Sequence, residues 1–212
     1  YEQKNEAIYL QKAEKYLDEF LKYSSNNYSG LGWGYNFGWQ TSEHYWQSGI
    51  PLITITPYAF WAFLRHYELT KNQKSYKTVI SIGEFALKDL NKRKMGNETI
   101  CSSYSPITKD IVINANSYRA AVLLGIYKLE GNKKYLEEAN ESIDFILSFQ
   151  GNRGEWYYEA KPPKDNFIDN FHTCFVLRNL YICNQINKRK DVLESIIRGY
   201  KFYNQELFYD NR

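Results

Sequence analysis

The sequence predicts an all-α fold in which repeated helical hairpins form a partial or incomplete α/α toroid. Three segments, residues 56–90, 116–149 and 170–207, each show two stretches with helical spacing of apolar residues, joined by a short polar turn. A further amphipathic helix is predicted at residues 7–23 and resembles the second member of a hairpin. The resulting odd number of seven helices favours an unclosed ring or a missing C-terminal helix.

The first hairpin shows the pattern most clearly. Apolar and aromatic residues recur at helical spacing along residues 58–67, a polar turn follows at 71–74, and an amphipathic partner covers 76–90. Polar turns at 130–133 and 187–190 divide the other two hairpins in the same way. The three segments are therefore predicted to be copies of one structural unit.

Three tyrosines set the alignment of the repeats. Tyr67, Tyr127 and Tyr181 take equivalent places, 60 and 54 residues apart. Counting back eleven residues from each tyrosine reaches three residues that we expect to act as helix N-caps: Thr56, Asn116 and Asn170. This alignment predicts that the surplus length of each repeat lies in the loops.

The connections between hairpins are long, spanning residues 24–55, 91–113 and 150–168. Long connections in compact domains are usually functional. Each leads from a second helix back to a first helix, so all three are expected to emerge at the same end of the bundle. They also contain four of the five tryptophans, which predicts an aromatic functional face there.

Composition narrows the class of protein. A chain of 212 residues with 43% hydrophobic residues can build one core, so a single domain over residues 1–212 is expected. The net charge of +3 is small, and the basic residues are scattered, which argues against nucleic acid as a partner.

Cysteine usage and hydropathy bear on the compartment. The three cysteines include no C-x-x-C pair, so we expect buried thiols in a reducing compartment rather than disulfides or zinc. No apolar stretch is long enough to span a bilayer, and the charged opening lacks a signal-peptide core, which predicts a cytoplasmic location. Because the chain does not begin with Met, it is also a candidate fragment of a longer protein.

His172 is the leading candidate for proton transfer. It follows Asp169 at the start of a predicted helix, and an imidazole held by a carboxylate suits acid–base chemistry near neutral pH. Glu43 lies among tryptophans in the first loop, where apolar surroundings favour a general acid. These three residues are the predicted catalytic set, with capping and surface solvation as their structural alternatives.

The predicted sugar-binding residues come from all three loops and the helix starts that follow them. Aromatic rings offer flat faces for sugar rings, amides offer hydrogen bonds to hydroxyl groups, and helix N-termini favour anions. The set comprises Trp33, Tyr35, Trp39, Gln40, Trp46, Tyr104, Asn114, Asn116, Trp156, Tyr157 and Asn170. The structural alternative is that the rings pack the loops and the amides cap helices.

Other chemistries lack their motifs. The sequence has no phosphate-binding G-x-x-x-x-G-K-[ST], no paired metal-ligand histidines and no G-x-S-x-G. No cofactor and no metal are therefore expected.

Five strings carry a resemblance over most of the chain: Gly32-Trp33-Gly34-Tyr35 with Trp39-Gln40, residues 101–106, Asn114-Ala115-Asn116, Trp156-Tyr157-Tyr158 and residues 168–173. Together they resemble prokaryotic proteins associated with surface-polysaccharide biosynthesis. The architecture is more distantly similar to six-hairpin toroids, which include unsaturated-uronyl hydrolases, polysaccharide lyases and glucuronyl C5-epimerases, and to terpenoid-cyclase toroids. Such relatives continue with another helix, which the resemblance implies would finish the ring.

The sequence therefore predicts a carbohydrate-active protein acting on an acidic polysaccharide or oligosaccharide by hydrolysis, elimination or epimerisation. The surplus of Tyr and His over paired acids favours elimination or epimerisation. Two alternatives remain: a noncatalytic glycan-binding or assembly module of polysaccharide biosynthesis, and an isoprenoid-handling toroid. The last usually needs an Asp-rich diphosphate motif, which is absent.

Overall fold

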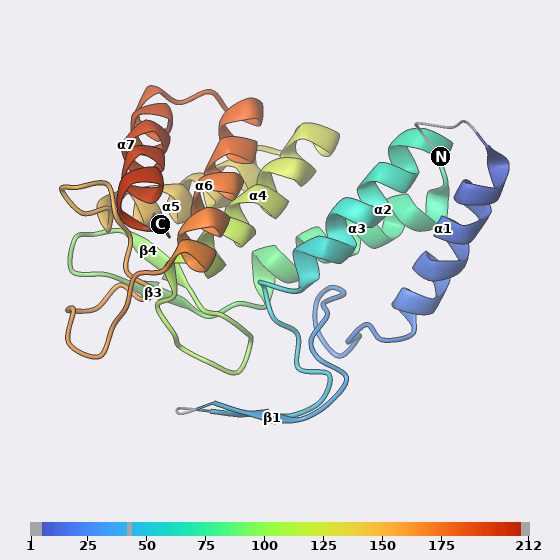
Figure 1. Ribbon diagram of the computed structural model, residues 1–212. Helices are drawn as coiled ribbons and strands as arrows, with labels where there is room; N and C mark the ends of the chain where they lie inside the picture. The colour runs from blue at the N-terminus through green and yellow to red at the C-terminus, as the bar shows by residue number, and fades with distance from the viewer. Residues whose placement is uncertain (1–5, 42–43, 209–212) are drawn as a thin grey trace. The chain divides into compact units, whose positions relative to one another are not determined.

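The computed structural model describes residues 6–41 and 44–208, and these form seven helices (Figure 1). The helices are α1 (Ala7–Leu21), α2 (Thr56–Thr70), α3 (Gln73–Lys88), α4 (Ile113–Glu130), α5 (Lys133–Ser148), α6 (Asn170–Ile186) and α7 (Lys190–Glu206). They fall where the sequence predicts them, with α4 beginning earlier than expected. The predicted all-α fold of helical hairpins is confirmed.

Two small antiparallel hairpins lie within the long connections. In the first, β1 (Trp39–Gln40) pairs with β2 (Tyr45–Trp46), and in the second, β3 (Lys92–Lys94) pairs with β4 (Ile100–Ser102). The sequence does not predict these strands, because two or three residues are too few to show an alternating pattern.

The chain divides into two compact units, residues 1–85 and residues 86–212. We call them the N-terminal unit and the C-terminal unit. The first loop belongs to the N-terminal unit, whereas the second and third loops belong to the C-terminal unit. A single domain over the whole chain stays a prediction.

The N-terminal unit is built around aromatic residues. Trp33 is 1% exposed, stacks on Phe20 of α1 with ring centroids 5.5 Å apart, and lies 6.4 Å from the ring of Phe63 in α2. Its indole N–H donates to the Phe20 carbonyl. His66 of α2 is buried and hydrogen-bonded to Ser75.

The C-terminal unit is centred on α4. Residues 113–126 of this helix are all buried, because α5 packs against one side and α6 against another, while α7 packs against α6. A helix enclosed in this way needs apolar residues all round rather than on one stripe. The sequence of α4 supplies them, with Arg119 as the charged exception.

The predicted N-caps are wrong in each repeat. The first helices of the hairpins begin at residues 56, 113 and 170, a constant spacing of 57. Asn116 therefore lies inside the first turn of α4, and the residue before α4 is Val112, which has no capping side chain. Thr56 is helical and hydrogen-bonds the backbone of Trp33, and Asn170 follows the true cap, Asp169.

The prediction that all three cysteines are buried is only partly confirmed. Cys101 and Cys183 are buried, but Cys174 is exposed on α6. Burial raises the pKa of the Cys101 thiol to about 12 and raises that of Cys183 as well, which keeps both protonated.

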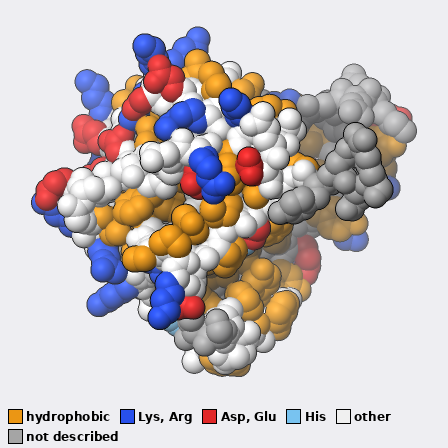
Figure 2. Space-filling model, turned by 60° about the vertical axis from the view of Figure 1, so that its left-hand side comes forward, with side chains coloured by type: hydrophobic (Ala, Val, Ile, Leu, Met, Phe, Trp, Pro, Cys, Tyr) orange, Lys and Arg blue, Asp and Glu red, His pale blue; other side chains and the backbone are white. Residues whose placement is uncertain are grey.

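Basic and acidic side chains are interspersed over the face shown in Figure 2, as the sequence predicts. Among the described residues, no helix is long and apolar enough to cross a bilayer.

Arg119 joins three helices through its buried guanidinium. Nε donates to the Ala86 carbonyl of α3 at 2.9 Å, while Nη1 and Nη2 reach Ser142 and Glu138 of α5 at 2.9 and 2.6 Å. Lys92 of β3 also contacts the Glu138 carboxylate, at 2.5 Å. The network thus ties the second loop to the helices beneath it.

This network predicts a loss of stability in acid. Burial raises the pKa of Glu138, but hydrogen bonds and charges from Lys92 and Arg119 outweigh that effect and hold it below its ordinary value of 4.5. A carboxyl with a lowered folded pKa stabilises the native state above pH 4.5 and loses this contribution as pH falls. Urea unfolding between pH 6 and 3 should show this decline, and Glu138→Gln should flatten it. An unchanged slope in the variant would contradict the assignment.

Candidate functional site

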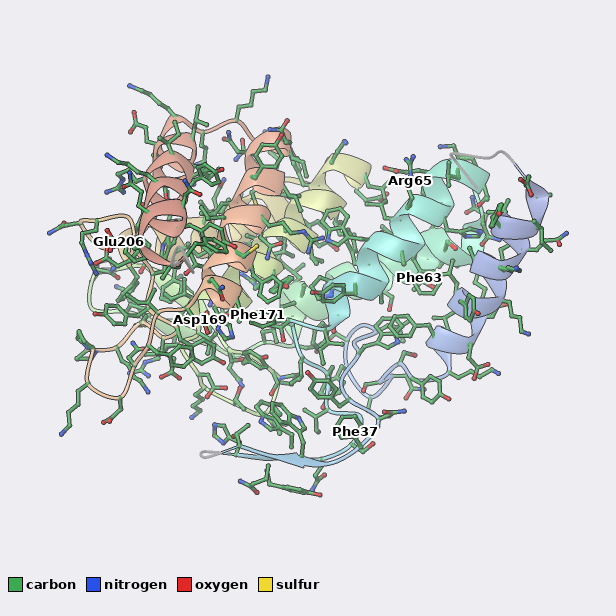
Figure 3. All side chains as sticks on the ribbon, in the orientation of Figure 1. Phe37, Phe63, Arg65, Asp169, Phe171 and Glu206 are labelled. Atoms are coloured by element: carbon green, nitrogen blue, oxygen red, sulfur yellow. The ribbon has the colours of Figure 1, made fainter. Side chains whose placement is uncertain are left out.

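His172 and Asp169 form a hydrogen-bonded pair at the start of α6 (Figure 3 labels Asp169). The Asp169 carboxylate accepts from the backbone N–H of His172 at 2.7 Å and from the ring Nδ1 at 2.8 Å. Because an ionised carboxylate can only accept, Nδ1 carries the proton and Nε2 is the basic nitrogen. Both side chains are partly exposed, at 27% and 36%. The pair is therefore accessible and oriented for proton transfer.

Three aromatic rings surround the imidazole. Tyr158 and Phe167 stack on each other 4.9 Å apart, and each presents its ring to His172, at 4.7 and 5.6 Å. Phe171, which is 60% exposed, lies edge-on at 5.2 Å. These rings fix the imidazole plane and leave an apolar surface beside it.

The second and third loops meet at this site. The N–H of Ile113, the first residue of α4, donates to the Tyr158 carbonyl, and the N–H of Tyr158 donates to Phe167. A further bond runs from Ala160 to Ile111. These two loops therefore lie at the same end of the C-terminal unit, as predicted; the position of the first loop beside them stays a prediction.

Asn114 lies near the start of the contact between α4 and α6. One turn further along α4, Ser117 accepts a hydrogen bond from Asn179 of α6, and Tyr118 contacts the ring of Phe175 at 5.4 Å. Residues three or four apart share a helix face, so Asn114 lies on the side of α4 that meets α6. The side chain is 4% exposed, and its Oδ1 has no partner among the described residues.

Two predicted binding residues are structural instead. Asn116 is fully buried, and its amide bonds the backbone of Ser102 and Val112, which anchors β4 to α4. Trp156 is 3% exposed, its N–H donates to Ile146, and a methyl group at Gly199 would overlap its ring. Neither side chain presents a free surface to a sugar, so the structure corrects both assignments.

Three other candidates lie at the edge of the site. Tyr104 and Tyr157 are half-buried in the second and third loops. Asn170 is exposed as the first residue of α6, next to the cap. All three are accessible, and their predicted roles remain hypotheses.

The first loop forms a separate aromatic cluster in the N-terminal unit. Trp39 and Trp46 are cross-strand partners in β1 and β2 and stack 6.2 Å apart. Tyr35 lies edge-on to Trp39 at 5.3 Å and stacks on Phe37 at the same distance. Tyr35 and Phe37 are 41% and 56% exposed, so this cluster, the aromatic hairpin, is open to solvent (Figure 3 labels Phe37).

The remaining first-loop candidates differ in how exposed they are. Trp33 and Trp46 are buried, at 1% and 5% exposed, so neither presents the open ring face that its predicted role in sugar binding needs. Gln40 is exposed, and its amide donates to the Thr41 carbonyl. Glu43 lies outside the described residues.

The third-loop acids are engaged in local structure. Glu155 accepts from the backbone N–H of Arg153 and contacts its guanidinium, which closes a turn. Glu159 pairs with Lys161. The described residues thus give His172 a single adjacent carboxylate, Asp169, and that one is hydrogen-bonded to it.

Sequence reasoning missed Phe167, Phe171 and Arg119. Phe171 lies between Asp169 and His172 in the sequence, so its position could have indicated that it belongs to the site. Phe167 could not be predicted from the sequence pattern. It reaches Tyr158 through a backbone hydrogen bond between these two residues, which are nine positions apart in the same loop. Arg119 was detectable as a lone charge within an apolar run.

Comparisons with known proteins give a fold and no family. No protein-family profile matches the chain, and no curated protein sequence matches it. Solved structures do match. The chain superposes on a family 76 glycoside hydrolase (mannosidase) from Bacteroides thetaiotaomicron with a TM-score of 0.62 and 14% identity, covering 93% of this chain and 54% of that one. The fold is that of an α/α toroid.

Two further structures support the same fold. A polysaccharide lyase matches with a TM-score of 0.58 and 15% identity over 92% of this chain and 52% of its own. A family 88 glycosyl hydrolase from Bacteroides vulgatus matches with a TM-score of 0.57 and 14% identity over 94% and 54%. The chain thus spans about half the length of these toroid enzymes.

Proposed function

We propose that this chain belongs to a carbohydrate-active protein that acts on an acidic polysaccharide or oligosaccharide at the starts of α4 and α6. The observation that carries the proposal is the accessible His172–Asp169 pair, enclosed by the rings of Tyr158 and Phe167. An imidazole that is polarised by a carboxylate and lies beside a flat apolar surface suits proton transfer to or from a stacked sugar ring. The carbohydrate-active proteins among the fold neighbours support it.

Elimination or C5-epimerisation is the reaction class that fits best. Both need a base that removes the proton next to a sugar carboxylate, and the free Nε2 of His172 supplies one. Hydrolysis by paired carboxylates requires two acids facing across the bond. Asp169 is hydrogen-bonded to His172, Glu155 contacts Arg153 and Glu159 pairs with Lys161, so none of these three carboxylates stands free to form such a pair.

The start of α4 supports an anionic group in the ligand. Val112 provides no capping side chain, and the N–H of Ile113 is used by Tyr158. Helix geometry leaves the next two N–H groups, those of Asn114 and Ala115, without intrahelical acceptors. Together with the helix dipole, they favour a carboxylate.

The aromatic hairpin supports a noncatalytic second candidate. Tyr35 and Phe37 expose stacked rings in a unit distinct from the one that contains His172. Sugar rings stack on such surfaces without any chemistry. The chain could then serve as a glycan-binding or assembly module of polysaccharide biosynthesis.

Ligand-induced stabilisation tests the proposal. Uronic-acid oligosaccharides at about 100 times Kd should add roughly 2.7 kcal/mol, or about 5–10 °C in Tm. Neutral mannan and glucan oligosaccharides should give smaller shifts. Tyr35→Ala should reduce the shift if the hairpin contributes, whereas Tyr16→Ala, which removes a more exposed tyrosine on α1, should leave it unchanged. No shift with any saccharide would contradict a glycan ligand.

A further inference from the structure

The aromatic hairpin exposes several large rings close together. Phe37 is 56% exposed and Tyr35 is 41% exposed, and their rings stack 5.3 Å apart. Tyr45 of β2 is 63% exposed, and a methyl group at Gly38 would overlap its hydroxyl group, so the glycine leaves room for this ring. Exposed apolar surface that is gathered in one place marks a binding site more often than scattered residues do.

The segment that contains the hairpin is almost free of charge. Residues 23–64 include a single charged residue, Glu43, whereas 24% of the whole chain is charged. Ligand carboxylates are usually held by Arg or Lys, and neither occurs in this segment. The hairpin therefore offers no partner of its own to a uronate and fits an uncharged ligand.

Exposed amides accompany the rings. Asn36 precedes β1, Gln40 ends it, and Gln47 follows β2, and all three side chains are exposed. Gln40 Nε2 donates to the Thr41 carbonyl at 2.6 Å, which orients this side chain. An amide both donates and accepts hydrogen bonds, as a sugar hydroxyl does. Because burying amides in lipid is costly, this composition favours a sugar over a bilayer surface.

Hydrogen bonds hold the hairpin in shape before any ligand binds. The Gly49 N–H donates to the Tyr35 carbonyl at 2.8 Å, which joins the two arms. Nearer the tip, the Thr41 N–H donates to the His44 carbonyl at 2.8 Å, and the His44 N–H donates to Thr41 Oγ1 at 2.9 Å. A surface that is already ordered loses little conformational freedom on binding, which favours affinity.

We propose that the aromatic hairpin is a second glycan-binding site, which stacks uncharged sugar residues on Tyr35 and Phe37. This inference rests on the proposed function and extends it, because the His172 pair takes acidic residues. The C–H groups on the face of a sugar ring are attracted to the negative face of an aromatic ring, and the sugar hydroxyls pair with the exposed amides. The polysaccharide then carries uncharged residues as well as acidic ones.

Isothermal titration with neutral mannan and glucan oligosaccharides measures this binding. Tyr35→Ala and Phe37→Ala should each weaken it about tenfold, the effect of losing one aromatic stacking partner. Tyr35→Phe keeps the ring and should keep most of the affinity, and Tyr16→Ala on α1 should leave it unchanged. Because both hairpin rings are exposed, the ligand-free Tm of the alanine variants should stay close to that of the wild-type chain.

Titration with oligogalacturonate separates this inference from the proposed function. If the wild-type chain binds oligogalacturonate but no neutral oligosaccharide, the inference fails and the proposed function stands. If neutral oligosaccharides bind through the hairpin and oligogalacturonate does not bind, the acidic substrate fails and the neutral site stands. Neutral binding that is unchanged in both alanine variants would overturn the inference.

Two other occupants of the hairpin are tested alongside the sugars. Co-sedimentation with phosphatidylcholine vesicles that is lost in Phe37→Ala, in a chain that binds no neutral sugar, would overturn the inference and assign the hairpin to a bilayer surface. Sedimentation equilibrium of the same two proteins tests for a second copy of the chain. Self-association that depends on Phe37, again without neutral sugar binding, would also overturn the inference.

Discussion

Turnover of an acidic glycan should fall by about 10²–10⁴-fold when His172 is replaced by glutamine, the range expected for loss of a general acid or base. Asp169 holds the His172 imidazole through Nδ1, and Tyr158 and Phe167 border the ring, so Nε2 is the nitrogen left for proton transfer. Glutamine keeps a polar side chain of similar reach but cannot exchange a proton near neutral pH. The substitution therefore removes the chemistry while conserving the shape.

Folding should survive this change. The helix cap depends on the backbone N–H of residue 172, which any side chain except proline retains. Arg178→Gln, an exposed residue two turns further along α6, serves as the control and should keep full turnover. Asp169→Asn should fall between the two, since an amide leaves the tautomer of His172 undetermined.

Three readouts distinguish the reaction. Elimination produces an unsaturated uronate that absorbs in the ultraviolet, hydrolysis produces reducing ends without that absorbance, and epimerisation exchanges the C5 proton with deuterated solvent. Whichever of these signals the wild-type protein gives should vanish in His172→Gln. Full activity in this variant would remove His172 from the mechanism and direct attention to Glu43.

Replacing Arg119 with alanine should lower the free energy of unfolding by about 3–5 kcal/mol, the cost of breaking a buried charged pair. The guanidinium is 1% exposed and bonds α3 and α5 from its position on α4. Its removal leaves the Ala86 carbonyl and the Ser142 hydroxyl without this partner. A cavity remains in addition.

Arg198→Ala provides the matched control. Arg198 is exposed on α7 and donates to Gln150 through one nitrogen, so its loss should cost less than about 1 kcal/mol. Urea denaturation of both variants measures the difference directly. Equal effects would show that the Arg119 network adds no more to stability than a surface contact.

The sequence determined the helices of this protein because their signals are local. Helical spacing of apolar residues and short polar turns placed all seven helices within a few residues. Left-handed residues Lys71 and Gly131 end α2 and α4 inside the predicted turns. The wrong N-cap prediction for α4 has a physical reason. One extra turn at the start of a helix continues the same spacing of apolar residues, so the sequence pattern does not show that α4 begins at Ile113.

The His172–Asp169 pair was also determined locally. The two residues are three apart at a helix start, where an aspartate cap and a first-turn side chain necessarily meet. The aromatic rings around this pair were not determined by the local sequence. Tyr158 and Phe167 are brought to His172 by hydrogen bonds between loop segments. A sequence pattern identifies which residues form a loop, but it does not predict the path of the loop backbone.

Only the tertiary structure separated exposed aromatic residues from buried ones. Trp33, Trp156 and Tyr35 occupy similar loops, yet the first two fill the cores of their units while Tyr35 remains open to solvent. The same holds for the amides: Asn116 is fully bonded, and the Oδ1 of Asn114 is not. Burial and hydrogen-bond satisfaction depend on neighbours distant in the chain, so residue type and spacing determine the helices, and packing decides which side chains remain free to bind a ligand.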